Sequence, residues 1–187
     1  PQVQYAKLLT DHLPASLNSV YFTNSGTEAT EGAMKLAKRV TKRTQIIAFN
    51  KSYHGSTQGA LSVIGDEYWR NAFRPLLPDV LHLEYNSFES LHSITEQTAC
   101  VIAETIQAEA GIIVPSVPWM QALRNKCTET ETLLILDEIQ TGFGRTGKLW
   151  GFENFDIVPD ILLLGKALGG GMPLGAFFAD KKLMQAL

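Results

Sequence analysis

The chain has 187 residues, 45% of them hydrophobic and 19% charged, and its formal net charge is −3. This composition fits one well-buried globular domain, and the lack of a basic stripe argues against nucleic acid as a partner. The apolar runs are too short to span a membrane, no signal peptide is visible, and Cys100 and Cys127 each stand alone, so we expect a cytoplasmic protein with two core thiols.

Strand and helix patterns alternate along the chain. In order, we predict a strand at 20–22, a helix at 26–40, a strand at 46–49, a helix at 57–64, a strand at 80–83, a helix at 88–95, a strand at 99–104, a helix at 118–130, and strands at 133–137, 161–164 and 176–179. The chain starts at Pro1 and its last residues, 181–187, look helical, so we expect it to be a piece of a longer protein. Strands that are apolar on both faces and separated by helices predict an α/β fold with a mostly parallel sheet flanked by helices.

Ligands of such a sheet bind beyond the carboxyl ends of its strands. The stretches that follow the predicted strands are therefore the candidate site. They lie at residues 24–27, 51–55, 104–109, 137–140 and 165–171.

The stretch LLILDEIQTGFGRTGK, residues 133–148, allows two interpretations. An apolar strand that ends in two carboxylates, followed by the spacing G-x-x-x-x-G-K, is typical of nucleotide hydrolases. However, Leu149 follows Lys148 where a phosphate loop needs Ser or Thr to hold magnesium, and no clean helical pattern comes next. We therefore interpret residues 142–148 as a glycine-rich surface loop.

The other interpretation is a site for pyridoxal phosphate. This cofactor needs a lysine for its aldehyde, a carboxylate beside its pyridine nitrogen, backbone N–H groups for its phosphate and a flat side chain against its ring. Lys166 follows an apolar strand and precedes Ala167-Leu168-Gly169-Gly170-Gly171. Partial burial there would favour the neutral amine that attacks carbonyls, although a lysine in this position is by itself more often only solvated.

Asp137 is the candidate partner of the pyridine nitrogen. It ends an apolar strand, where an ionised group needs a partner, and a pyridinium N–H would supply one. Taken alone, Asp137 is as readily a cap or turn residue. Glu138 points to the opposite face by strand alternation, so only one of the two carboxylates should face the cofactor.

Ser25, Gly26 and Thr27 join a strand to a helix and are the candidate phosphate site. Ser25 or Thr27 is equally well placed as a helix N-cap, and the two roles are compatible. Tyr53 is the candidate ring-stacking residue, although a lone aromatic in a loop more often only packs. His54 beside it is a possible base, but no second histidine stands at ligand spacing, which disfavours a metal.

Five stretches together carry a family resemblance: Asn24-Ser25-Gly26-Thr27-Glu28-Ala29, Tyr53-His54-Gly55, Asp137-Glu138-Ile139-Gln140-Thr141-Gly142, Gly144-Arg145-Thr146-Gly147 and Gly165-Lys166-Ala167-Leu168-Gly169-Gly170-Gly171. They resemble class III (ω-amino-acid) pyridoxal-phosphate-dependent aminotransferases over essentially the whole chain. The resemblance implies the aspartate-aminotransferase-like fold (fold type I), a homodimer, pyridoxal phosphate as cofactor, and amino-acid and 2-oxo-acid substrates.

The resemblance also implies roles for the residues around the cofactor ring. Lys166 would bind the cofactor covalently and shuttle a proton, and Asp137 would pair with the ring nitrogen. Gln140 would approach the phenolic oxygen. Tyr53 would stack on the ring, with His54 beside it in the cofactor site.

Further roles concern the phosphate and the substrate. Gly26 and Thr27 would bind the phosphate, with Ser25 next to them. Glu104 would help to position Asp137 or the ring pocket, and Glu109 resembles the glutamate that gates the contacts of a substrate-binding arginine.

Two departures from the family pattern stand out. The usual Glu-Pro-x-Gln-Gly-Glu is here Glu104-Thr105-Ile106-Gln107-Ala108-Glu109. Threonine for proline is expected to loosen this loop, and alanine for glycine fits only where φ is negative, so the departures bear on the placement of Glu109. Family members are also more than twice as long, so residues 1–187 would be part of the cofactor-binding large domain, without the N-terminal segment and the C-terminal small domain.

Within the family, Phe73-Arg74-Pro75-Leu76-Leu77-Pro78, Tyr85-Asn86 and residues 145–150 look most similar to acetylornithine or succinylornithine aminotransferases. The implied reaction transfers the terminal amino group of such an acylated ornithine to 2-oxoglutarate. Ornithine and 4-aminobutyrate enzymes are the nearest alternatives. A catalytically inactive cofactor-binding or dimerisation core is the alternative from another class.

Overall fold

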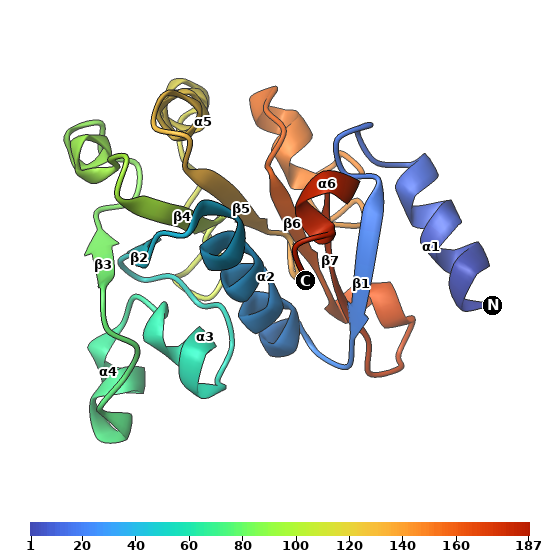
Figure 1. Ribbon diagram of the computed structural model, residues 1–187, viewed down its shortest axis with the longest axis horizontal. Coiled ribbons are helices and arrows are strands. Elements are labelled where there is room, and N and C mark those ends of the chain that lie inside the picture. The colour runs from blue at the N-terminus through green and yellow to red at the C-terminus, as the bar shows by residue number, and fades with distance from the viewer.

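Seven strands form one sheet in the computed structural model, which describes residues 1–187 (Figure 1). They are β1 (Ser19–Thr23), β2 (Gln45–Phe49), β3 (Val80–Leu83), β4 (Thr98–Glu104), β5 (Leu133–Asp137), β6 (Ile161–Leu164) and β7 (Gly175–Ala179). Their order across the sheet is β1-β7-β6-β5-β4-β2-β3, and β7 alone runs opposite to the other six strands. The prediction of a mostly parallel sheet is confirmed.

Helices cover both faces of this sheet (Figure 1). The α-helices are α1 (Gln2–Asp11), α2 (Gly26–Thr41), α3 (Gln58–Ser62), α4 (Glu67–Arg70), α5 (Val117–Glu129) and α6 (Lys181–Met184). Short 3-10 helices lie between them: η1 (Asn71–Phe73), η2 (Glu89–Ser93), η3 (Gly151–Phe155) and η4 (Lys166–Gly169). None of the helices is long and apolar enough to cross a membrane.

The sheet separates two apolar cores because its strands are apolar on both faces. On β5, Leu134 and Leu136 point to the core under α5 and α1, whereas Ile135 points to the core under α2. All three side chains are fully buried, and each such burial contributes about 1.5–3 kcal/mol. Cys100 and Cys127 belong to these two cores as free thiols, and burial raises the pKa of each to about 12.

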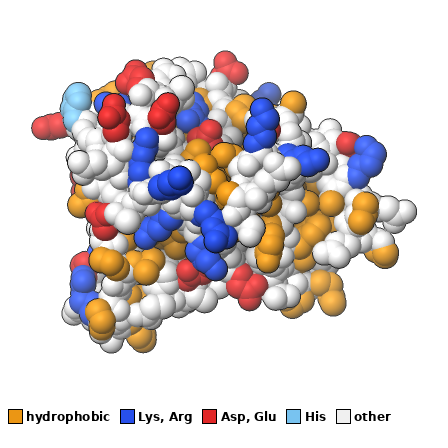
Figure 2. Space-filling model, in the orientation of Figure 1, with side chains coloured by type: hydrophobic (Ala, Val, Ile, Leu, Met, Phe, Trp, Pro, Cys, Tyr) orange, Lys and Arg blue, Asp and Glu red, His pale blue; other side chains and the backbone are white.

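Helix α2 shows how the sequence sets one of these layers. Ser25 caps its start by accepting a hydrogen bond from the N–H of Glu28, and the small side chains Ala33 and Ala37 let it lie close to the sheet. The opposite side of α2 carries lysine and arginine, and Figure 2 shows basic side chains across the face on which this helix lies.

Two sequence predictions need correction. Residues 88–95 do not form an α-helix: only η2 is helical there, and its residues bond to carbonyls three positions back, as in Leu91 N–H to Phe88 O at 3.2 Å. The helix predicted at 57–64 is shorter, because α3 ends at Ser62, and Gly65 beyond it packs closely against the backbone of Phe49. Helices α1 and α4 were not predicted.

Gly175 on β7 offers a test of close packing beside the β1–α2 turn. A Cβ added there would lie 2.2 Å from the carbonyl oxygen of Ser25, a backbone atom that cannot move freely. We expect Gly175→Ala to lower the free energy of unfolding by about 3 kcal/mol, measured by urea denaturation. Gly144→Ala is the comparison, because its added Cβ would touch nothing and only its φ of +82° is unfavourable. Equal losses in the two variants would contradict the crowding at Gly175.

Candidate active site

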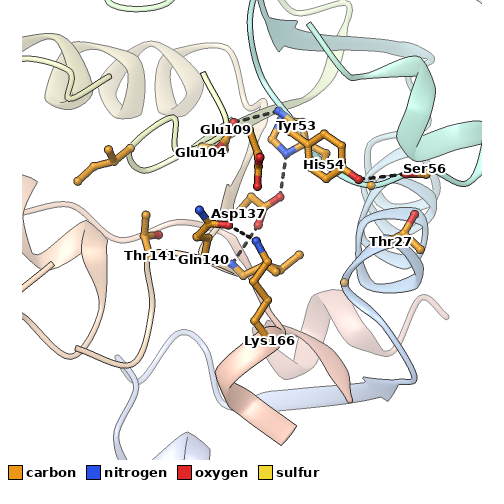
Figure 3. A pocket seen from close by; sticks show the side chains of 14 residues that line it. Thr27, Tyr53, His54, Ser56, Glu104, Glu109, Asp137, Gln140, Thr141 and Lys166 are labelled. Carbon is orange, nitrogen blue, oxygen red and sulfur yellow. Dashed lines mark hydrogen bonds and ion pairs between the residues drawn. The ribbon is translucent and has the colours of Figure 1, made fainter. Parts of the chain in front are cut away.

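A cavity of about 280 Å³ opens at the carboxyl ends of the parallel strands. It is lined by residues from the segments that follow β1, β2, β4, β5 and β6, which is where the fold predicts a ligand. Every predicted site residue except Ser25 lines it, and Figure 3 shows their side chains converging from different segments. The sheet thus brings together positions that are up to 140 residues apart, from Gly26 to Lys166.

Asp137 and His54 form a buried pair at the centre of the cavity. His54 Nδ1 lies 2.8 Å from Asp137 Oδ2, and because a carboxylate only accepts, the imidazole donates this hydrogen bond (Figure 3). The N–H of Ile139 donates to the other oxygen, Asp137 Oδ1, at 3.0 Å. These contacts fix the carboxylate at the end of β5 while each oxygen keeps a free lone pair.

Lys166 enters the cavity from the turn that follows β6. Its Nζ donates a hydrogen bond to Gln140 Oε1, so the amine points toward the end of β5 (Figure 3). Its backbone lies in the left-handed region with φ of 42°, a strained conformation for a residue with a side chain. The side chain is exposed, so the expectation of partial burial is wrong for the chain as the structure describes it.

Glu104 joins two of the loops that form the cavity. Its Oε1 accepts the N–H of Tyr53 and its Oε2 accepts the N–H of Ala108, each at 3.0 Å. Burial raises the pKa of Glu104, while nearby His54 and these two N–H groups lower it. Glu104 lies beside Asp137 in the register of the sheet but makes no hydrogen bond to it, so its side chain joins the two loops rather than holding Asp137.

The two departures at residues 105 and 108 are accommodated. Ala108 is not among the residues with positive φ, as the alanine requires. Thr105 does not loosen its loop as expected, because it is fully buried and its hydroxyl donates a hydrogen bond to Glu138 at 3.0 Å. Despite these departures, Glu109 lines the cavity (Figure 3).

The turn into α2 is tightly packed at the predicted phosphate site. A Cβ on Gly26 would lie 2.7 Å from Ile139 Cδ1, so a larger residue there would require the Ile139 side chain to shift. The Thr27 hydroxyl lies 2.7 Å from that of Thr57, which joins this turn to the start of α3. Ser25 lies outside the cavity and serves as the N-cap, the alternative already recognised from the sequence.

A second cavity of about 580 Å³ adjoins the first and shares Gln140 and Lys166 with it. Phe143 and Arg145 also line it, so residues 142–148 are more than a surface loop. Arg145 makes no ion pair in the chain. The sequence could have indicated this role, because the loop follows closely after Asp137 at the end of a strand. A phosphate loop must be followed by an α-helix, but the element after this loop is the short 3-10 helix η3.

The residues present fit pyridoxal phosphate. The cavity offers a fixed carboxylate in Asp137, an amine in Lys166, a phenol ring in Tyr53 and the first N–H groups of α2. His54 Nε2 is buried without a hydrogen-bond partner, so the imidazole is held through its Nδ1 bond to Asp137. No group of three or more His, Cys, Asp or Glu side chains is placed to hold a metal ion.

Comparison with known proteins agrees with this arrangement. The family model for class-III aminotransferases matches residues 1–187. The chain is 47% identical over 174 residues to a [LysW]-aminoadipate semialdehyde/glutamate semialdehyde transaminase of Sulfurisphaera tokodaii, covering 93% of the chain and 45% of that protein. It is 44% identical over 187 residues to an acetylornithine aminotransferase of Methanopyrus kandleri, covering 100% of the chain and 48% of that protein.

Solved structures show the same fold. The ornithine aminotransferase of Toxoplasma gondii, described with partial occupancy of PLP at its active site, superposes with a TM-score of 0.93 at 30% identity, over 99% of this chain and 46% of that one. This chain thus spans about half the length of the relatives that it matches. The match of the family model over residues 1–187, together with these relatives, shows that the chain belongs to the class-III aminotransferase family.

Proposed function

We propose that this chain is part of the large, pyridoxal-phosphate-binding domain of an ω-amino-acid aminotransferase. The observation that carries the proposal is the meeting of Lys166, Asp137 and Gln140 in one cavity at the strand ends. The proposed whole enzyme acts on small amino acids and 2-oxo acids and is a homodimer, as the family resemblance implies.

When bound, pyridoxal phosphate supplies an aldehyde for amines and a ring that accepts electrons from the substrate carbon. Asp137 would keep a proton on the ring nitrogen, and His54 holds the carboxylate in place through the 2.8 Å hydrogen bond. Gly26 and Thr27 would hold the phosphate with the N–H groups at the start of α2. Tyr53 would lie against the ring and exclude water from it.

Lys166 would hold the cofactor through its Nζ, and the same atom would accept and donate a proton when it is free. Gln140 holds the amine within reach, since its Oε1 already accepts a hydrogen bond from Nζ. Arg145 in the second cavity is a cation without an acidic partner and suits a substrate carboxylate. Glu109 lies across the first cavity and bounds the space left for the substrate.

The proposed amino donor is N-acetylornithine or N-succinylornithine, with 2-oxoglutarate as acceptor. The acetylornithine aminotransferase of Methanopyrus kandleri, at 44% identity, supports this choice. The transaminase of Sulfurisphaera tokodaii, at 47% identity, supports [LysW]-aminoadipate semialdehyde or glutamate semialdehyde as the rival substrate. Similarity to the ornithine aminotransferase of Toxoplasma gondii supports ornithine as a further alternative donor. The family resemblance adds 4-aminobutyrate as another.

The test is an absorbance spectrum of the chain with pyridoxal phosphate, followed by borohydride reduction and peptide mass mapping. We expect a cofactor-sized adduct on Lys166. A folded chain with no adduct there would contradict cofactor binding by this chain. An adduct without transamination of any of the amino donors above would favour a catalytically inactive cofactor-binding core.

A further inference from the structure

Glu138 is fully buried and lies outside both cavities. Its carboxylate accepts three hydrogen bonds: from the N–H of Gly151 to Oε2 at 2.6 Å, and to Oε1 from the N–H of Phe152 at 2.6 Å and from the Thr105 hydroxyl at 3.0 Å. Both oxygens face donors, so a glutamine would turn its NH₂ toward one of the two backbone N–H groups. The site is therefore built for a carboxylate.

These hydrogen bonds join segments that are far apart in sequence. Thr105 belongs to the loop after β4, and Gly151 follows the loop formed by residues 139–150. Because Glu138 directly precedes that loop, its side chain ties the end of the loop back to its start. The contact is close: a Cβ on Gly151 would lie 3.0 Å from Glu138 Oε1 and 3.2 Å from Thr105 Cγ2.

The loop at residues 139–150 forms walls of both cavities. Gln140 near its start is bonded to Lys166. Near its end, the Trp150 ring packs edge-on against Phe143 with ring centroids 5.2 Å apart, and Phe143 lines the second cavity beside Arg145. Release of the loop at Gly151 would therefore reach the residues that face the ligand.

We propose that Glu138 is a positioning residue that, together with Thr105, holds the loop at residues 139–150 closed over the two cavities. In this state Gln140 meets Lys166, and Phe143 and Arg145 shape the second cavity. The Thr105 hydroxyl supplies one of the three hydrogen bonds to Glu138. Proline, which stands at this position in the family pattern, has no hydrogen-bond donor and could not supply it. The effect on the cofactor site rests on the proposed function, whereas the closure of the loop does not.

The experiment compares Thr105→Val, which removes the hydroxyl at nearly constant shape, with Thr105→Ser, which keeps it, and with Glu138→Gln. Amide hydrogen exchange is followed by mass spectrometry at pH 8, above the value of about 7 to which burial raises the pKa of Glu138. We expect exchange in residues 139–152 to quicken about tenfold in Thr105→Val and further in Glu138→Gln. Thr105→Ser should match the unsubstituted chain, and exchange in α2 should not change in Thr105→Val or Thr105→Ser.

The second readout is the dissociation constant of pyridoxal phosphate, which should rise in the two variants whose loop exchanges faster. The closure of the loop by Glu138 would be overturned by either of two results in Thr105→Val. One is equally faster amide exchange in all peptides, and the other is unchanged amide exchange in residues 139–152. Faster loop exchange with unchanged cofactor affinity would overturn the positioning role and leave the proposed function standing. If the unsubstituted chain did not bind pyridoxal phosphate, the proposed function and the positioning role would fail together, and the exchange data would still decide the closure.

Discussion

Lys166→Ala is expected to abolish the covalent attachment of pyridoxal phosphate to the chain. The Lys166 amine lies in the first cavity, pointing toward the end of β5, and no other lysine lines either cavity. Alanine removes the only lysine amine that lines these two cavities. The measurement is borohydride reduction with pyridoxal phosphate followed by peptide mass mapping, and we expect the adduct in the peptide of residue 166 to disappear.

Lys148→Ala is the matched control for this variant. Lys148 is also exposed and lies on the loop that borders the second cavity, but its side chain lines neither cavity. Its loss should leave the adduct on Lys166 at the level of the unsubstituted chain. A Lys166→Ala chain that folds and still carries a single specific adduct in the cavity would contradict the proposed role of this lysine.

The positions of these residues could be predicted because the sheet follows from a simple pattern. Runs such as residues 133–137 and 161–164 are apolar on both faces, which places them inside a parallel sheet, and the residues after them must then meet at one edge. The burial of Glu138 away from Asp137 follows from the same alternation. Hydrophobic periodicity did not predict α1 and α4, because each buries only one side chain and so carries a weak apolar pattern.

The partners of the site residues could not be predicted in the same way. The hydrogen bond between His54 and Asp137 joins residues 83 positions apart, and no local pattern in the sequence encodes it. The second cavity depends on how residues 142–148 fold back toward Lys166, and glycines at positive φ leave such a loop many conformations before packing selects one. The tie between Thr105 and Glu138 likewise appears only when β4 and β5 lie side by side.

Asp137→Asn is expected to slow the reaction of the bound cofactor with an amino donor by about a hundredfold or more. Asparagine keeps the shape of the side chain and one acceptor oxygen, but it loses the charge that would hold a proton on the ring nitrogen. Removing one prearranged electrostatic partner of a reacting group typically lowers the rate by about a hundredfold to a thousandfold. The adduct on Lys166 should still form, because the amine itself is unchanged. The measurement is the decay of the cofactor's visible absorbance after N-acetylornithine is added.

Asp160→Asn separates this effect from a loss of stability. Asp160 precedes β6, and its Oδ2 accepts hydrogen bonds from Arg124 and from the N–H of Leu134, each at 2.7 Å. Its loss weakens the opposite end of the same sheet without touching either cavity. If the two variants lose similar free energy of unfolding and only Asp137→Asn loses rate, the Asp137 charge acts on the cofactor. If both lose rate equally, Asp137 acts through the stability of the fold and not through its charge on the cofactor.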